Sequence, residues 1–282
     1  MALFSKICYF LLMSESIIYS VLSIFGISLV SLIGIFTVSF SEKTLEKMLI
    51  YMISFAAGGL LGDAFIHLLP ESIAQDGFSL SISVYILIGI AFSFIIEKLI
   101  HWRHCHHPTT HDHPHPFALM NLFGDGVHNF IDGLIIGAAY LVSIPVGAAT
   151  TIAVLLHEVP QEIGDFGVLI HGGMSKKKAL IMNFLTALSA FLGLGVALAI
   201  GSQVEGLTSF LLPFAMGSFI YIAVADLIPE MHKEVCTSRS LLQFTFFILG
   251  ISLMFLMLFI PGHDEMHEHE EGHVEHIEVV EL

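Results

Sequence analysis

Long apolar segments constrain this chain more than any other feature of its sequence. Windows of roughly 20 residues, the length of helix that crosses a bilayer, predict eight apolar spans within the 282 residues. The spans cover residues 17–40, 46–69, 79–100, 117–141, 146–170, 178–201, 207–229 and 241–261. With 55% apolar and 12% charged residues, the chain has too little polar surface for a soluble domain of this length. We therefore predict an all-α membrane protein embedded in a lipid bilayer.

The basic residues fall almost entirely on one side of this arrangement. Nine of the ten Lys and Arg residues lie in or beside the connections that follow odd-numbered spans, and only Lys6 lies on the other side. By the positive-inside rule these connections are cytoplasmic, so we expect both termini to be extracytoplasmic and the protein to lie in the cell (inner) membrane. Residues 7–13 behind Lys6 leave one alternative open, because they also resemble the apolar core of a signal peptide.

The formal charge of −15 at pH 7 does not indicate a nucleic-acid partner. Eight of the acidic residues lie in the last twenty positions, which contain no Lys or Arg, so we expect no binding to nucleic acid. Cys8, Cys105 and Cys236 are scattered singly and predict neither a disulfide framework nor a thiolate zinc site. A homodimer is a candidate assembly.

An internal repeat divides the predicted helical domain. Residues 55–71 align without a gap with residues 214–230, and both segments end in Leu, an apolar residue, Pro and Glu. The predicted topology runs these two spans in opposite directions, which makes the repeat inverted. Inverted repeats are typical of secondary transporters, whose binding sites lie near the bilayer midplane between the halves. The alternative is that Gly- and Ala-rich helices resemble one another by composition alone.

Imidazoles and carboxylates lie at the centres of the fourth and fifth spans. Ionised groups at this depth cost several kcal/mol unless a partner compensates them, and a bound divalent cation would do so. His128 and Asp132 are spaced i and i+4, as are His157 and Gln161, so each pair shares a helical face and can converge with the other. The candidate metal ligands are His128, Asn129, Asp132, His157, Glu158, Gln161, Glu162 and Asp165. For Asp63, His67 and Asn183, further ligation and ordinary hydrogen bonding between helices are equally good explanations.

This donor set indicates which ions and which reactions to expect. Mixed carboxylate and imidazole ligands suit Zn²⁺, and also Fe²⁺, Mn²⁺ or Cd²⁺. A zinc-dependent intramembrane hydrolase is the competing hypothesis, but the segment that begins with His157 and Glu158 carries Gln161 where HExxH has its second His. A metal sensor would need an output domain that the chain does not contain. We expect a protein that is not an enzyme.

At these residues the chain resembles the ZIP (ZRT/IRT-like protein) family of divalent-metal transporters. His128, Asn129, Asp132 and Gly133 match the family's fourth-span motif. The fifth span resembles the branch with the metalloprotease-like signature His-Glu-x-Pro-His-Glu-x-Gly-Asp-Phe; the matching residues are His157, Glu158, Pro160, Glu162, Gly164, Asp165 and Phe166. Gln161 departs from this pattern, because that branch usually has His there.

The resemblance implies transport of divalent metal ions toward the cytoplasm by a 3+2+3 arrangement of eight helices. Spans one to three would be related to spans six to eight, with spans four and five between them. It also implies a binuclear centre, in which the first metal is held by His128, Asp132, His157 and Gln161. The second would be held by Asn129, Asp132, Glu158 and Gln161.

Two His-rich segments flank the predicted helices. We expect residues 1–261 to form the helical domain, with a His-rich cytoplasmic connection at 101–116, and residues 262–282 to form a His- and Glu-rich extracytoplasmic tail. Such tracts bind metal weakly and without fixed geometry. An exit path at the cytoplasmic end would use Glu97, His101, Asp226, Glu230 and His232.

Overall fold

The computed structural model describes residues 2–104 and 115–259, and over these residues the chain is helical without any strand. The tail at 262–282 and most of the His-rich connection lie outside the described residues. The elements are α1 (Ala2–Val30), η1 (Ser31–Ser39), α2 (Glu42–Gly62), η2 (Asp63–Leu68), α3 (Leu69–Asp76), α4 (Leu80–His104), α5 (Pro116–Val142), α6 (Ile144–His171), α7 (Lys176–Ala187), α8 (Ser189–Ile200), η3 (Gly201–Gln203), α9 (Val204–Tyr221), η4 (Ile222–Leu227), α10 (Ile228–Met231) and α11 (Thr237–Met257).

Six helical segments of the described chain are long and apolar enough to cross a membrane. They are Glu15–Phe36, Lys47–Asp76, Leu80–Leu99, Lys176–Ile200, Gly206–Met231 and Thr237–Met257, which overlap six of the eight predicted spans. The other two predicted spans fall on α5 and α6, which have 27 and 28 residues. Both of these helices carry carboxylates and imidazoles at their centres.

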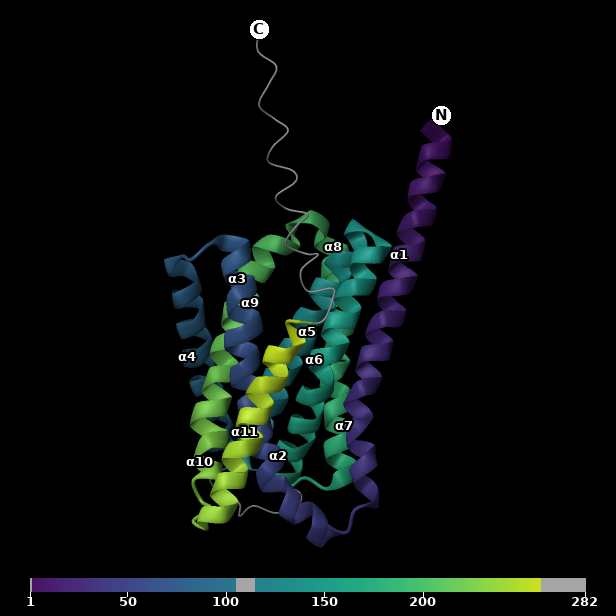
Figure 1. Cartoon of the computed structure of the whole chain (residues 1–282). Coiled ribbons are helices and arrows are strands. Elements are labelled where there is room, and N and C mark those ends of the chain that lie inside the picture. The colour runs from purple at the N-terminus through teal and green to yellow at the C-terminus, as the bar shows by residue number, and fades with distance from the viewer. Residues whose placement is uncertain (1, 105–114, 260–282) are drawn as a thin grey trace.

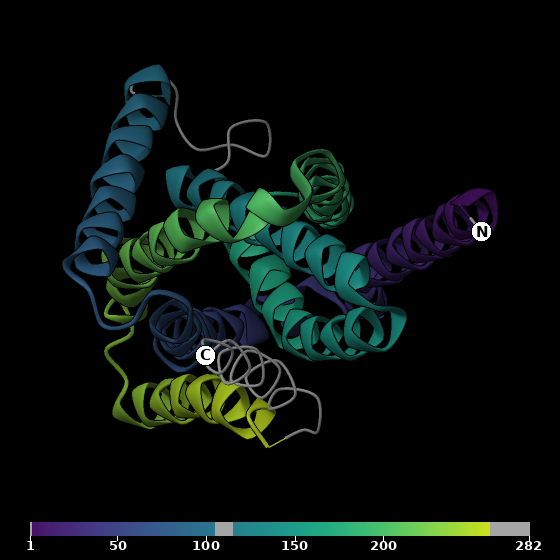
Figure 2. The same cartoon turned by 90° about the horizontal axis from the view of Figure 1, so that it is seen from above.

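The polar helices α5 and α6 lie inside the bundle, packed against each other (Figure 2). α6 also packs on α1 and α2, while α5 packs on α8 and α9. Glycines allow this close approach: a Cβ on Gly133 would lie 1.9 Å from the Ala190 backbone oxygen, and one on Gly164 would lie 2.9 Å from the Ala56 Cβ. Neighbouring helices therefore cover the segments that lipid would solvate poorly.

The two segments of the internal repeat have matching local structure. η2 and η4 are both π-helical, and they are separated by the same 159 positions that align Phe55 with Phe214. α2 and α9, which precede them, run in opposite directions (Figure 1). A Cβ on Gly58 of α2 would lie 2.0 Å from the Phe247 backbone oxygen of α11. At the equivalent position of α9, a Cβ on Gly217 would lie 2.2 Å from the Ile86 backbone oxygen of α4.

The sixth predicted span is interrupted at Leu188, between α7 and α8. Backbone groups freed by a break inside a membrane need partners from the protein. The Ser28 hydroxyl donates to the Ala187 carbonyl at 3.2 Å, and the Ser189 hydroxyl donates to the Gly126 carbonyl at 2.7 Å. These bonds tie the break to α1 and α5.

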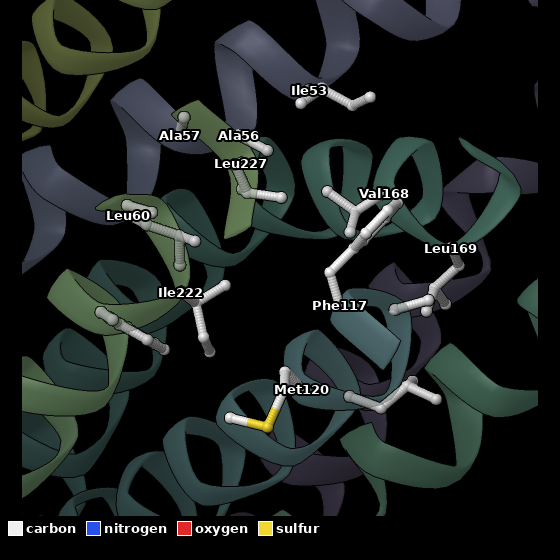
Figure 3. Close-up of a cluster of buried hydrophobic side chains, with 14 of the residues drawn as sticks. Ile53, Ala56, Ala57, Leu60, Phe117, Met120, Val168, Leu169, Ile222 and Leu227 are labelled. Carbon is white, nitrogen blue, oxygen red and sulfur yellow. The ribbon is translucent and has the colours of Figure 1, made fainter. Parts of the chain in front are cut away.

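An apolar layer fills the bundle toward the end where α6 meets α7. We define it by Phe117, Met120, Val168, Leu169 and Leu227, which come from α5, α6 and η4 and belong to one buried cluster (Figure 3). Phe117 and Met120 lie in the first turns of α5, whereas Val168 and Leu169 lie in the last turn of α6. The layer therefore separates the centres of α5 and α6 from that end of the bundle.

Candidate metal centre

Four side chains converge where the middles of α5 and α6 face each other. His128 and Asp132 come from α5, and His157 and Glu158 come from α6. One ligand atom from each lies within 4.8 Å of the other three. The side chains of His128 and Glu158 are 2% and 1% exposed, and that of His157 is 14% exposed. An ion bound here would be almost fully removed from solvent.

The distances within this cluster fit a cation better than direct hydrogen bonds. His128 Nε2 lies 3.6 Å from Asp132 Oδ2 and 3.5 Å from Glu158 Oε1, and His157 Nε2 lies 3.5 Å from the same Asp132 oxygen. Hydrogen bonds of this type are shorter. Bonds of 2.0–2.2 Å in a tetrahedral zinc site would hold two ligand atoms about 3.4 Å apart. All four atoms are buried and have no hydrogen-bond partner among the described residues, so a divalent cation would satisfy them together.

Asn129 places one polar atom beside the cluster. Its amide nitrogen donates to Asp125 Oδ1 at 2.7 Å, which fixes the orientation of the side chain. Its Oδ1 is buried and has no hydrogen-bond partner in the described part of the chain. The oxygen is therefore available to a cation, and its place in a second metal position stays a prediction.

Gln161 lies one helical turn beyond His157 and lines a pocket between α2, α6 and α11. The pocket is lined by Phe55, Ala56, Gly59, Leu60, Pro160, Gln161, Asp165 and Met254. The Gln161 Nε2 is buried without a hydrogen-bond partner among the described residues. These contacts do not test the predicted role of Gln161 as a metal ligand.

Glu162 and Asp165 belong to a different set of contacts from the four-residue cluster. Asn183 on α7 donates to Glu162, and Asn121 on α5 donates to Asp165 Oδ1 at 2.9 Å. Thr186 on α7 donates to Asp125. Sequence analysis did not single out Asn121 or Thr186. Asn121 could have been found, because it lies one turn before Asp125 on the polar stripe of α5.

The π-helical segment η2 forms another wall of the site. Asp63 Oδ1 lies 3.1 Å from His67 Nδ1, and Asp63 Oδ2 lies 4.0 Å from His128 Nδ1. The rings of His67 and His157 are 6.1 Å apart. A carboxylate near the second nitrogen of a ligating His is a common way to orient the ring. Glu71, which sequence analysis missed as a site residue, interacts electrostatically with Asp132 and His157.

The predicted exit residues lie on α4, on η4 or in the residues that follow η4. The Tyr221 hydroxyl donates to Glu97, and His171 Nε2 lies 3.1 Å from Glu230 Oε2. Asp226 is half-buried and interacts electrostatically with Glu97 and Glu230. His232 is exposed, and the side chain of His101 lies outside the described part of the structure.

Comparisons with known proteins agree with this geometry. The sequence matches the model of the ZIP zinc transporter family over residues 14–118 and 115–258. Zinc transporter zipt-7.1 of Caenorhabditis briggsae is 30% identical, over 85% of this chain and 78% of the relative. Zinc transporter ZIP13 of Pongo abelii is 35% identical over 73% of this chain, and zinc transporter SLC39A7 of Rattus norvegicus is 31% identical over 75% of it. The matches span 65% of each of these two longer relatives.

Proposed function

The chain belongs to the ZIP zinc transporter family, and from this premise we propose that it carries divalent metal ions, above all Zn²⁺, across a membrane toward the cytoplasm. The observation that carries the proposal is the set of four unpartnered ligand atoms of His128, Asp132, His157 and Glu158 at the centre of the bundle. Fe²⁺, Mn²⁺ and Cd²⁺ are proposed as competing substrates, because the same donor types accept them.

A midplane position for these ligands suits transport rather than storage. A transported ion must exchange its hydration shell for protein ligands and then leave again on the other side. The cluster supplies two imidazoles and two carboxylates, and only His157 is exposed by more than a few per cent. An ion reaching it from either side requires a rearrangement of the helices, as alternating access demands.

We further propose the eight-helix 3+2+3 arrangement, with α5 and α6 as the central pair. Support comes from the matched π-helical segments η2 and η4 and from the matched contacts of Gly58 and Gly217. The opposite directions of α2 and α9 support an inverted relation of the halves (Figure 1). A homodimer remains a candidate assembly of this unit.

The membrane orientation is proposed from charge. α1 begins at one end of the bundle and α11 runs toward that end, whereas the connection from α6 to α7 lies at the other (Figure 1). Lys176, Lys177 and Lys178 begin α7 there. The basic end is proposed to face the cytoplasm of a cell (inner) membrane. A reporter active only outside the cytoplasm should work when fused after Leu282 and fail when inserted before Lys176. The opposite pattern would reverse the proposed direction.

The hydrolase hypothesis is not favoured. The matching relatives are named zinc transporters. In addition, α6 carries Gln161 where a zincin-like helix would place its second imidazole. Glu158, the residue that such an enzyme would use as a base, lies instead within the ligand cluster.

Flux through the purified protein tests the function. Reconstituted liposomes should take up Zn²⁺, which a fluorescent chelator sealed inside them reports. His128→Ala or His157→Ala should reduce the initial rate of uptake at least tenfold. Lys177→Ala, which removes an exposed side chain that the proposed pathway does not use, serves as the control and should stay near the parent rate. Absence of uptake by the folded parent protein would overturn the function. Normal uptake by both ligand variants would overturn the site.

A further inference from the structure

A buried carboxylate beside the four-residue cluster holds the amide of Asn129. The Asn129 Nδ2 donates to two oxygens of Asp125, the side-chain Oδ1 at 2.7 Å and the backbone carbonyl at 3.2 Å. Both residues lie on α5, four positions apart, and both are almost fully buried. Asp125 itself supplies none of the four converging ligand atoms.

These two contacts determine which way the amide of Asn129 is turned. A backbone carbonyl and an ionised carboxylate only accept hydrogen bonds, so both must face the NH₂ group of the amide rather than its oxygen. The torsion that turns an amide group has broad, roughly two-fold preferences, so the side chain does not impose this choice by itself. Asp125 therefore leaves the Asn129 Oδ1 unused, and this buried oxygen has no hydrogen-bond partner among the described residues.

The carboxylate of Asp125 is held in turn by a residue of α7. Its Oδ2 accepts a hydrogen bond from the hydroxyl of Thr186, which lies two residues before the interruption at Leu188. The same hydroxyl lies 2.8 Å from the Asn183 carbonyl and 3.2 Å from the Met182 carbonyl, the usual partners of a Thr inside a helix. Both oxygens of the Asp125 side chain are thus occupied, one by α7 and one by Asn129.

The unused oxygen of Asn129 lies on the part of α5 that carries the ligands. Asn129 directly follows His128 and precedes Asp132 by three positions, a spacing that makes helical residues neighbours. Asp125 interacts electrostatically with Asp132 and with Glu158. An amide oxygen turned toward these residues would attract a bound cation, whereas the NH₂ group in its place would repel one.

We propose that Asp125 is a positioning residue of the metal centre: together with Thr186, it holds the amide of Asn129 so that the oxygen faces the bound ion. The inference deepens the proposed function and rests on it, because it requires an ion in the centre. Carbonyl and carboxylate oxygens suit Mn²⁺, whereas imidazoles suit Zn²⁺. The correctly turned amide should therefore contribute more to the binding of Mn²⁺ than to that of Zn²⁺.

The ratio of the Mn²⁺ and Zn²⁺ dissociation constants tests this role in full-length, detergent-solubilised protein. Bound Mn²⁺ is measured by the loss of the electron paramagnetic resonance signal of the free ion, and Zn²⁺ by competition with a chelator. Binding that survives in the His128→Ala, His157→Ala double variant belongs to other segments and is subtracted. Asp125→Leu removes both side-chain acceptors at similar size and should weaken Mn²⁺ binding about tenfold more than Zn²⁺ binding, as for other partners that orient a metal ligand.

Three further variants separate positioning from charge and from packing. Asp125→Asn should weaken both ions alike and keep the parent ratio, because the charge is lost while an oxygen remains to accept from Asn129. Thr186→Val keeps the charge and should shift the ratio in the same direction as Asp125→Leu, by about two- to fivefold, as for one lost hydrogen bond. Thr151→Val is the matched control: its hydroxyl donates to the Gly147 carbonyl of its own helix at 2.7 Å, and the ratio should stay unchanged.

The effect of Asp125 should disappear when Asn129 is absent. In an Asn129→Ala background, Asp125→Leu should cause no further change in the ratio. An equal change in both backgrounds would overturn the proposal, because Asp125 would then act independently of Asn129. Equal ratios in Asp125→Leu and Asp125→Asn would also overturn it, because charge alone would then explain the effect.

Thr186→Val keeps the test decisive if Asp125→Leu does not fold, because it removes one hydroxyl and no charge. The same ratio in Thr186→Val and Thr151→Val would then overturn the proposal. The expected ratios without liposome flux would overturn the transport function and leave the positioning role standing. Flux with unchanged ratios would do the reverse.

Discussion

Asp132 is the proposed ligand whose replacement best tests the four-residue cluster against the larger set of ligands predicted from the sequence. Its Oδ2 lies within 3.6 Å of His128 Nε2 and of His157 Nε2, so it is the shared neighbour of both imidazoles. Asp165 is also a buried carboxylate and was also a predicted ligand, but its contact is with Asn121 at 2.9 Å. Asp132→Asn and Asp165→Asn are therefore chemically identical changes in different surroundings.

The expected loss of affinity follows from the number of ligands. Binding free energies of about 10–16 kcal/mol in four-ligand zinc sites correspond to roughly 3 kcal/mol for each ligand. Asp132→Asn should therefore weaken Zn²⁺ binding about 100-fold. Asp165→Asn removes a charge outside the cluster and should change the affinity by less than about threefold, because Asn can still accept the hydrogen bond from Asn121.

Competition with a fluorescent chelator of known affinity measures both constants in detergent-solubilised protein. The His-rich segments contribute equally to the two variants, so the comparison isolates the buried site. Equal losses of affinity in the two variants would refute the four-residue ligand set, and no loss in Asp132→Asn would remove Asp132 from it.

Two more predictions address the departure at Gln161 and the packing of α8. Gln161→His should bind Zn²⁺ roughly tenfold more tightly, because an imidazole is a stronger zinc ligand than an amide. The KM for transport should fall and the maximal flux should stay equal or fall, because a tightly held ion leaves slowly. Unchanged affinity and metal selectivity in competition assays would mean that this side chain does not face the metal. Gly193→Ala should lower stability by about 1–3 kcal/mol, seen as a lower thermal midpoint, because its Cβ would lie 1.9 Å from the Phe130 carbonyl oxygen. Gly195→Ala, whose Cβ would meet nothing within 4 Å, is the control, and an equal drop there would contradict the packing argument.

The helical membrane character of the chain could be predicted because hydropathy and length are local properties. The convergence of His128 and Asp132 with His157 was also within reach, since a spacing of four residues places side chains on one helical face. The place of Glu162 and Asp165 in one metal set with these residues stays a prediction, and their hydrogen bonds are with Asn183 and Asn121. Helical spacing gives the face of a residue, but not the neighbouring helix that its side chain meets.

The contacts of Asp63, Asn183 and Thr186 show what the sequence could not supply. Whether Asp63 approaches His128 depends on how α2 packs beside α5, and on the π-helical segment that begins at Asp63. π-helical turns have no simple sequence signature. Similarly, the pairing of Asn183 with Glu162 depends on the position of α7, which a periodic pattern does not specify.

The arrangement of apolar and polar helices follows from the energetic cost of the buried polar groups on α5 and α6. Glu158 and Asp132 would be costly in lipid, and each has a buried oxygen without a hydrogen-bond partner among the described residues. Helices α1, α2, α8 and α9, which can face lipid, therefore cover α5 and α6, and glycines such as Gly133 and Gly164 bring the backbones close enough to exclude it. The same close packing keeps the unpaired ligand atoms 3.5–3.6 Å apart, close to the spacing of about 3.4 Å between two ligands of one tetrahedral zinc ion. A cation that binds these groups in the folded state alone should therefore stabilise the protein, by RT ln(1 + [metal]/Kd) for one site.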